Sequence, residues 1–130
     1  MEMTYATFVG ALAKPGATIL EELHPGEAHL MHMLLGLAGE VGELVEGVGI
    51  SFTNGQDAGR ENVIEELGDI DFYLQGIRNI YEISDEIIAT SKDDITSKNS
   101  PAETLLRLMI AVGKLIDTLK KEIIYGRPVD

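Results

Sequence analysis

The stretch that decides the fold is GEVGELVE, residues 39–46. At about 100° per residue in an α-helix, the carboxylates of Glu40, Glu43 and Glu46 share one stripe of the helix surface. Apolar residues occupy the opposite stripe: Leu37, Val41, Leu44 and Val48. The segment is therefore predicted to be a helix with an acidic face and an apolar back.

A second helical pattern surrounds EELGD, residues 65–69, where Glu66 and Asp69 share a stripe with Tyr73. Most of its apolar residues take the other side: Val63, Leu67, Ile70, Leu74 and Ile77. Because the Gly-rich segment 47–59 between the two patterns is short, we expect the two helices to lie antiparallel with their apolar backs together. This arrangement directs four carboxylates toward one point: Glu40, Glu43, Glu66 and Asp69.

Length and composition bound the rest of the chain. The chain has 130 residues, of which 45% are hydrophobic, so we expect a single all-α domain over residues 1–130. We expect this domain to be an antiparallel helical bundle of about five helices, in which two long helices carry the acidic site. The absence of Cys excludes disulfides, thiolate metal sites and Cys nucleophiles. No apolar run reaches the roughly 18 residues of a membrane span and residues 1–7 carry no basic region, so we expect a soluble cytoplasmic protein. The net charge of −12 disfavours polynucleotides but is compatible with a free nucleotide bridged by a metal ion.

Helix start and stop signals divide the chain into segments. Helical patterns cover, approximately, residues 4–13, 17–23, 27–48, 61–81, 85–94 and 101–125. The last has the clearest boundaries, because Ser100 and Glu103 form a capping box with Pro between them and Gly126 is a stop signal. Residues 49–59 are predicted to be a loop, with residues 50–53 as an alternative extension of the preceding helix.

The chain also contains a weak internal repeat. A shift of 71 residues places Gly126 on Gly55 and matches the apolar pattern of residues 101–130 to that of the first half, whose residues 30–83 form the core hairpin. Two of the three acids of the first copy are not repeated, because Ala111 and Lys114 align with Glu40 and Glu43. Only Glu46 aligns with another acidic residue, Asp117. We expect the second copy to pack against the first long helix, in its own chain or a partner's, with Lys114 toward the acidic side.

Four converging carboxylates favour a divalent cation. Two like charges ~4 Å apart repel by about 4 kcal/mol at an effective dielectric of 20, and a cation reverses that sign. Ligands that offer only oxygen suit Mg²⁺ or Mn²⁺, which indicates chemistry on phosphate esters or anhydrides. The alternative interpretation of such an acidic stripe is a solvated helix face. Gly36, Gly39, Gly42 and Gly47 each destabilise a helix by up to ~1 kcal/mol relative to Ala, and either a ligand or tight helix packing explains them.

These motifs carry a family resemblance. LMHMLLGLAGEVGELV at residues 30–45, followed by NVIEELGDIDFYL at residues 62–74, resembles the MazG-like branch of the all-α nucleoside triphosphate pyrophosphohydrolases, over about residues 4–83. The resemblance implies that Glu40, Glu43, Glu66 and Asp69 bind Mg²⁺, and that water attacks between the α and β phosphates of a nucleoside or deoxynucleoside triphosphate to give a monophosphate and pyrophosphate. Glu43 and Glu66 are then the residues on which turnover depends, with Glu43 as the proton acceptor.

Two further residues are weaker candidates for substrate binding. Family members continue with a helix that bears an Asn and a Lys for the nucleotide, and here residues 87–95 offer Lys92 and no Asn. His32 lies two turns before Glu40 on the acidic stripe, where it either touches a phosphate or packs against its neighbours.

The oligomeric state and an alternative function complete the expectations. Apolar surface on residues 30–48 and 105–119 is broader than one packed side needs, and members of the family typically build their sites within a dimer or tetramer, so we expect a homodimer or homotetramer. The alternative to a pyrophosphohydrolase is a catalytically silent helical oligomerisation module of the same fold.

Overall fold

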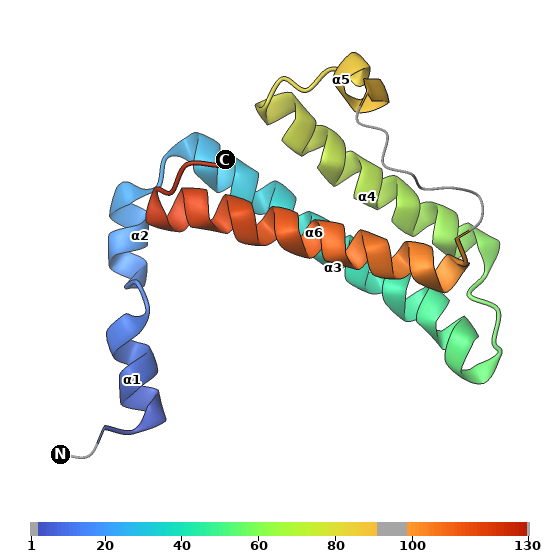
Figure 1. Ribbon diagram of the computed structural model, residues 1–130, viewed down its shortest axis with the longest axis horizontal. Coiled ribbons are helices and arrows are strands. Elements are labelled where there is room, and N and C mark those ends of the chain that lie inside the picture. The colour runs from blue at the N-terminus through green and yellow to red at the C-terminus, as the bar shows by residue number, and fades with distance from the viewer. Residues whose placement is uncertain (1–2, 91–98, 130) are drawn as a thin grey trace.

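The computed structural model describes residues 3–129 apart from 91–98, and only the backbone of residues 89 and 90. It consists of α1 (Tyr5–Leu12), α2 (Gly16–Glu22), α3 (Pro25–Asn54), α4 (Arg60–Ile80), α5 (Asp85–Thr90) and α6 (Pro101–Tyr125) (Figure 1). No strand occurs within the described ranges, which confirms the all-α helical bundle. Three of these helices are long, and residues 91–94 of the predicted fifth helix lie outside the described part.

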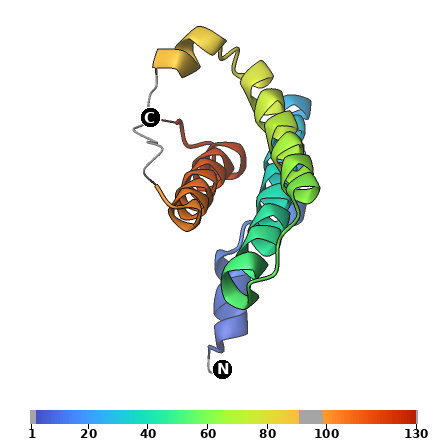
Figure 2. The same cartoon turned by 90° about the vertical axis from the view of Figure 1, so that its right-hand side faces the viewer.

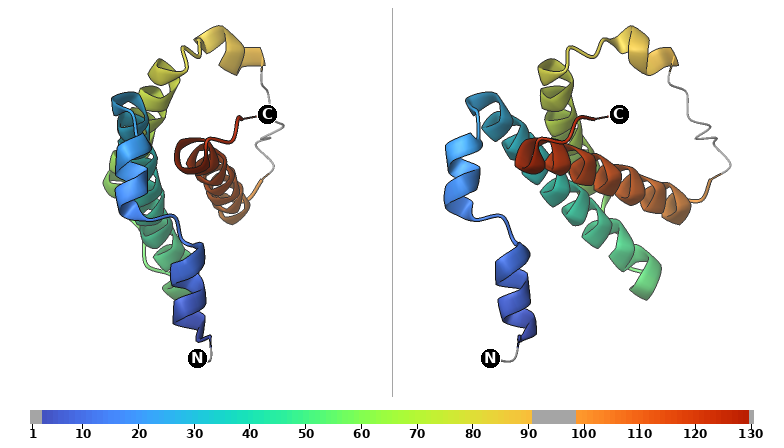
Figure 3. Two further views of the ribbon diagram at one scale, coloured as in Figure 1. Left: turned by 90° about the vertical axis from the view of Figure 1, so that its left-hand side faces the viewer. Right: turned by 60° about the vertical axis from the view of Figure 1, so that its left-hand side comes forward.

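The longest helix, α3, is the centre of the bundle. It packs against α4 on one side and against α6 on the other, and α4 returns antiparallel to it as the hairpin prediction requires (Figures 1 and 2). The expected packing of residues 101–125 on the first long helix is thus confirmed within one chain, whereas the expected direction of Lys114 toward the acidic side stays a prediction. By contrast, α1 and α2 continue past the N-terminal end of α3, and α1 points away from the three long helices (Figure 3).

The apolar core lies along α3. This helix contributes more buried apolar residues than α4 and α6 combined, and Leu37 is completely buried. The buried set consists of Leu30, Met33, Leu34, Leu37, Val41 and Leu44 from α3, Ile70 and Ile77 from α4, and Val112, Leu119 and Ile123 from α6. These residues recur at the helical spacing of the predicted apolar backs. Leu67 departs from that pattern, since it is 49% exposed.

Local signals account for the ends of α6. The Ser100 hydroxyl accepts a hydrogen bond from the Glu103 backbone N–H at 3.2 Å, which caps the helix as predicted. Glu103 does not return a bond to the cap, because its carboxylate accepts from Arg107 instead. At the other end Gly126 has φ +59°, and Gly55 at the end of α3 has φ +68°, so the two aligned glycines of the repeat adopt the same left-handed cap.

The connection between the first two long helices is shorter than the predicted loop 49–59. Helix α3 runs to Asn54, so the alternative extension over residues 50–53 is the one observed. The helix stops only where Gly55 supplies the left-handed conformation. Next, the backbone N–H of Ala58 donates to the Ser51 hydroxyl at 3.0 Å, which ties the remaining connection to the last turn of α3.

Close approach of backbone to side chain sets the spacing between α3 and α4. A Cβ at Gly36 would lie 2.0 Å from Tyr73 Cε1, and one at Gly76 would lie 2.2 Å from Met33 Sδ. Around Gly39 and Gly42, in contrast, nothing lies within 4 Å of the Cβ position. Helix packing therefore explains the glycine at residue 36 but not those at residues 39 and 42.

None of the helices in the described ranges is both long and apolar enough to cross a bilayer.

Candidate metal centre

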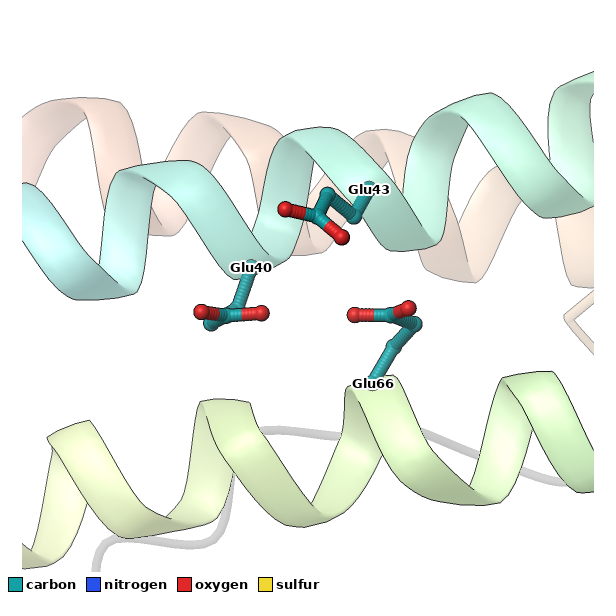
Figure 4. Close-up of side chains that lie close together, drawn as sticks. All are labelled: Glu40, Glu43 and Glu66. Carbon is teal, nitrogen blue, oxygen red and sulfur yellow. The ribbon is translucent and has the colours of Figure 1, made fainter.

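Three carboxylates from two helices meet between α3 and α4. Glu40 and Glu43 extend from α3, and Glu66 extends from α4 into the same space (Figure 4). One carboxylate oxygen of each residue lies within 4.8 Å of the other two. We call these three residues the acidic cluster. A single cation placed among them can be contacted by all three side chains.

The local sequence explains why these three side chains converge. Glu40 and Glu43 are one helical turn apart, so they project from the same side of α3. Directly across, Glu66 occupies the facing turn of the antiparallel helix, and Gly36 holds that helix close because it allows Tyr73 to pack on the backbone. Buried apolar residues on both helices, Val41 and Ile70 among them, fix the rotation of each helix.

Glu66 has the most unusual environment of the three. Its exposed fraction is 7%, and no other charged residue in the described part of the chain is buried. Burial raises the pKa of its carboxyl group, and the negative charges of Glu43, Glu40, Glu65 and Asp69, in decreasing order, raise that pKa further. No hydrogen bond or ion pair reaches its carboxylate from the described part of the chain. Its ionised form therefore has no counter-charge of its own.

The donor set fits a hard divalent cation. Glu40 is half-buried and Glu43 is exposed, so the cluster is open on one side while Glu66 closes the other. Carboxylate oxygens are the ligands that Mg²⁺ and Mn²⁺ accept in proteins, and Mg²⁺ commonly keeps water or phosphate oxygens in its remaining positions. A cation here would also supply the positive charge that the buried carboxylate of Glu66 lacks.

The remaining predicted site residues lie outside the acidic cluster. Asp69 is exposed, and its charge still raises the pKa of Glu66, but it is not among the three converging carboxylates. Glu46 is exposed one turn beyond Glu43. Lys92 lies outside the described residues.

His32 has a specific neighbour that the sequence did not indicate. Its ring meets the edge of the Tyr73 ring, with the centroids 6.2 Å apart. Because the same Tyr73 packs on Gly36, His32 belongs to the packing that holds α3 against α4 as well as lying on the acidic side. Tyr73 had been placed on the acidic stripe of α4 by its spacing, but nothing in the sequence pairs it with Gly36.

Sequence reasoning also missed an apolar cavity on the far side of the hairpin. The cavity, about 550 Å³ in volume, lies where α3, α4 and the first turns of α6 meet. The one available signal was the apolar Leu67, which was expected to be buried and instead lines this cavity while remaining half exposed.

Comparison with known proteins adds no relative to this description: the chain matches no protein-family model, no curated protein and no solved structure.

Proposed function

We propose that the protein hydrolyses nucleoside or deoxynucleoside triphosphates to a monophosphate and pyrophosphate, with Mg²⁺ or Mn²⁺, and so cleanses nucleotide pools. The observation that carries the proposal is the acidic cluster itself, in which the buried Glu66 faces Glu40 and Glu43 without a cationic partner. A solvated acidic face has no reason to bury a carboxylate among other carboxylates. The sequence resemblance described above supports the same chemistry.

Each residue of the cluster has a role suited to its surroundings. Glu40 and Glu66 would hold the cation from the two facing helices, and Asp69, outside the cluster, would contribute its negative charge from α4. When bound, the metal ion would neutralise the triphosphate and lower the pKa of a water molecule. Glu43 is the most exposed of the three and accepts the proton of the attacking water. The water oxygen forms a bond to phosphorus, the bond between the α and β phosphates breaks, and pyrophosphate leaves.

The surface beside the cluster leaves room for a substrate. Gly39 and Gly42 directly precede Glu40 and Glu43, and no atom outside their chain neighbours and the backbone of their own helix lies within 4 Å of either Cβ position. A polyphosphate can therefore approach the α3 backbone there more closely than it could approach a helix with longer side chains.

Pyrophosphate release tests this proposal. Each NTP and dNTP is incubated with the purified protein and Mg²⁺, and Glu66→Ala is the inactive reference. Loss of a ligand should lower turnover by more than about 100-fold, since removal of the residues that merely support metal ligands already costs 10–100-fold. Glu46→Gln is the matched control, because Glu46 lies on the same face of α3 but outside the acidic cluster, and it should keep parental activity.

The outcome decides between the two functions that the sequence allows. Release by the parent protein no faster than by Glu66→Ala rules out the enzyme and leaves the catalytically silent oligomerisation module of the same fold.

A further inference from the structure

The chain exposes far more surface than a compact monomer of its size. Its accessible surface is 9740 Å². A folded monomer of 14.1 kDa has about 6,700 Å², so the excess is about 3,000 Å². Stable interfaces remove about 800 Å² per partner, and obligate homodimers remove considerably more. The excess is therefore of the size that association with another protein surface would cover.

Part of the exposed apolar surface belongs to α1. Its residues Tyr5, Phe8, Val9 and Leu12 are between 44% and 81% exposed, and the helix has no buried residue. The segment from residue 3 to residue 13 contains no charged side chain. At 8 residues, α1 is also shorter than the roughly 12 residues that an isolated helix needs to persist in water. Its apolar face requires a cover that the rest of its own chain does not provide.

A matching apolar groove lies at the opposite end of the bundle. The cavity of about 550 Å³ is lined from three helices by Leu44, Val48, Val63, Leu67, Leu105 and Leu108. Near the other end of the bundle the Tyr81 hydroxyl, just after α4, donates to Glu122 of α6 at 3.2 Å. The charged residue in the lining is Arg107, which already pairs with Glu103. The groove therefore suits an uncharged helix.

Helix α1, which we call the arm, cannot reach the apolar groove of its own chain. Lys14, directly after α1, donates to the Ile124 carbonyl at 2.6 Å and pairs with Glu22, which fixes the start of the arm beside the last turn of α6. From Ile124 back to Leu108 the helix spans about 24 Å, whereas the 8 residues of α1 span about 12 Å.

We propose that the protein forms a two-fold dimer in which α1 of each copy docks into the apolar groove between α3, α4 and α6 of the other copy. A two-fold axis across the middle of α3 exchanges the ends of the bundle, so the arm of one copy meets the groove of the next and the reverse contact forms at the same time. In such a dimer each of the two α1 helices is docked and each of the two grooves is filled. Because arm and groove carry no unpaired charge, two chains of net charge −12 meet at the part of the surface where their repulsion is weakest.

Cross-linking tests the arm-to-groove contact directly, because the chain has no cysteine of its own. Phe8→Cys and Ala111→Cys are prepared separately, mixed and oxidised. Ala111 is exposed and lines the groove, and Phe8 is exposed on α1, so neither change disturbs the core. A disulfide-linked species of twice the chain mass that needs both variants is expected. Ile88→Cys on α5 replaces Phe8→Cys as the control and should give no such species with Ala111→Cys.

The oligomeric state gives the second readout. Light scattering should show a dimer at micromolar concentration, and Phe8→Ser should raise its dissociation constant by about tenfold per arm, hence about a hundredfold, with the circular dichroism of the other helices retained. Ile88→Ser, which removes an equally exposed apolar side chain, should leave the dimer intact. The proposal would be overturned if the parent were a monomer or if Phe8→Ser left the dimer unchanged. It would also be overturned if a chain carrying both Phe8→Cys and Ala111→Cys formed the disulfide only within itself.

Discussion

At Glu66, burial and like charge act in the same direction on one carboxyl group. Both raise its pKa above the ordinary glutamate value, burial more strongly than the charges of Glu43 and Glu40 on α3 or of Glu65 and Asp69 on α4. A carboxyl group of this kind is neutral over a wider pH range than an ordinary glutamate unless a cation binds beside it. The same feature therefore destabilises the metal-free protein, and a cation bound beside Glu66 would remove that cost.

Replacement of Glu66 by Gln should stabilise the metal-free protein at neutral pH. Because the folded-state pKa is raised, the stabilising contribution of Glu66 is fully present below its unfolded pKa and is lost as the pH rises through the folded pKa. Glu66→Gln lacks this loss, so its unfolding midpoint should exceed that of the parent at pH 7 and converge with it below about pH 4, the ordinary range of a glutamate. Urea titrations of both proteins in EDTA, from pH 3.5 to pH 8, measure the effect. If the difference in stability between the parent and Glu66→Gln did not change between pH 3.5 and pH 8, the raised pKa assigned to Glu66 would be wrong.

Addition of Mg²⁺ should raise the melting temperature of the parent protein. A ligand at 100 times its dissociation constant stabilises by about 2.7 kcal/mol if it binds only the folded state. Glu40→Gln removes one carboxylate of the acidic cluster and should abolish most of this response, whereas Glu46→Gln should respond as the parent does. Scanning calorimetry with and without Mg²⁺ at matched ionic strength makes the comparison. An undiminished response in Glu40→Gln would exclude the cluster as the binding site.

Among the elements, the helices whose ends carry strong local signals were the predictable ones. Ser100 and Gly126 bound α6 as the sequence predicts, since a cap depends on residues within one turn. The hairpin and the convergence of three of the four predicted carboxylates followed from the helical periodicity of the sequence. Asp69 shows the limit of that argument, because a shared stripe does not determine whether each side chain on it reaches the cluster. The pairing of Gly36 with Tyr73 could not be predicted, since it depends on the register of two helices.

Gly36 and Gly39 form a matched pair that tests the packing of α3 on α4. Gly36→Ala should destabilise the protein by about 1–3 kcal/mol, because the new methyl group would overlap the Tyr73 ring. Gly39→Ala, one turn along the same helix with open space around it, should instead stabilise by about 0.5–1 kcal/mol through helix propensity. Chemical denaturation of the two variants gives both values. Equal effects of the two substitutions would show that the helices do not approach at Gly36.

For the whole molecule, the proposed dimer must form against considerable repulsion. Each copy carries a net charge of −12, so two copies repel over roughly 10 Å in 0.1 M salt. The contacts proposed for α1 and the groove are apolar, and apolar burial is not weakened by screening. Nothing in the periodicity of residues 5–12 distinguishes a helix that folds back on its own chain from one that leaves it. This part of the architecture depends on the anchoring of Lys14 at the far end of α6.

Salt should therefore strengthen the dimer. As NaCl is raised from 20 to 500 mM, screening lowers the repulsion between the two acidic chains while the apolar contacts persist, so the dissociation constant should fall severalfold. Sedimentation equilibrium of the parent protein across this series measures it, and Phe8→Ser should show a weaker dimer with a similar salt slope, since the substitution changes no charge. A dimer that weakens with salt would mean that ion pairs hold the two copies together, in which case the uncharged α1 arm is not the principal contact.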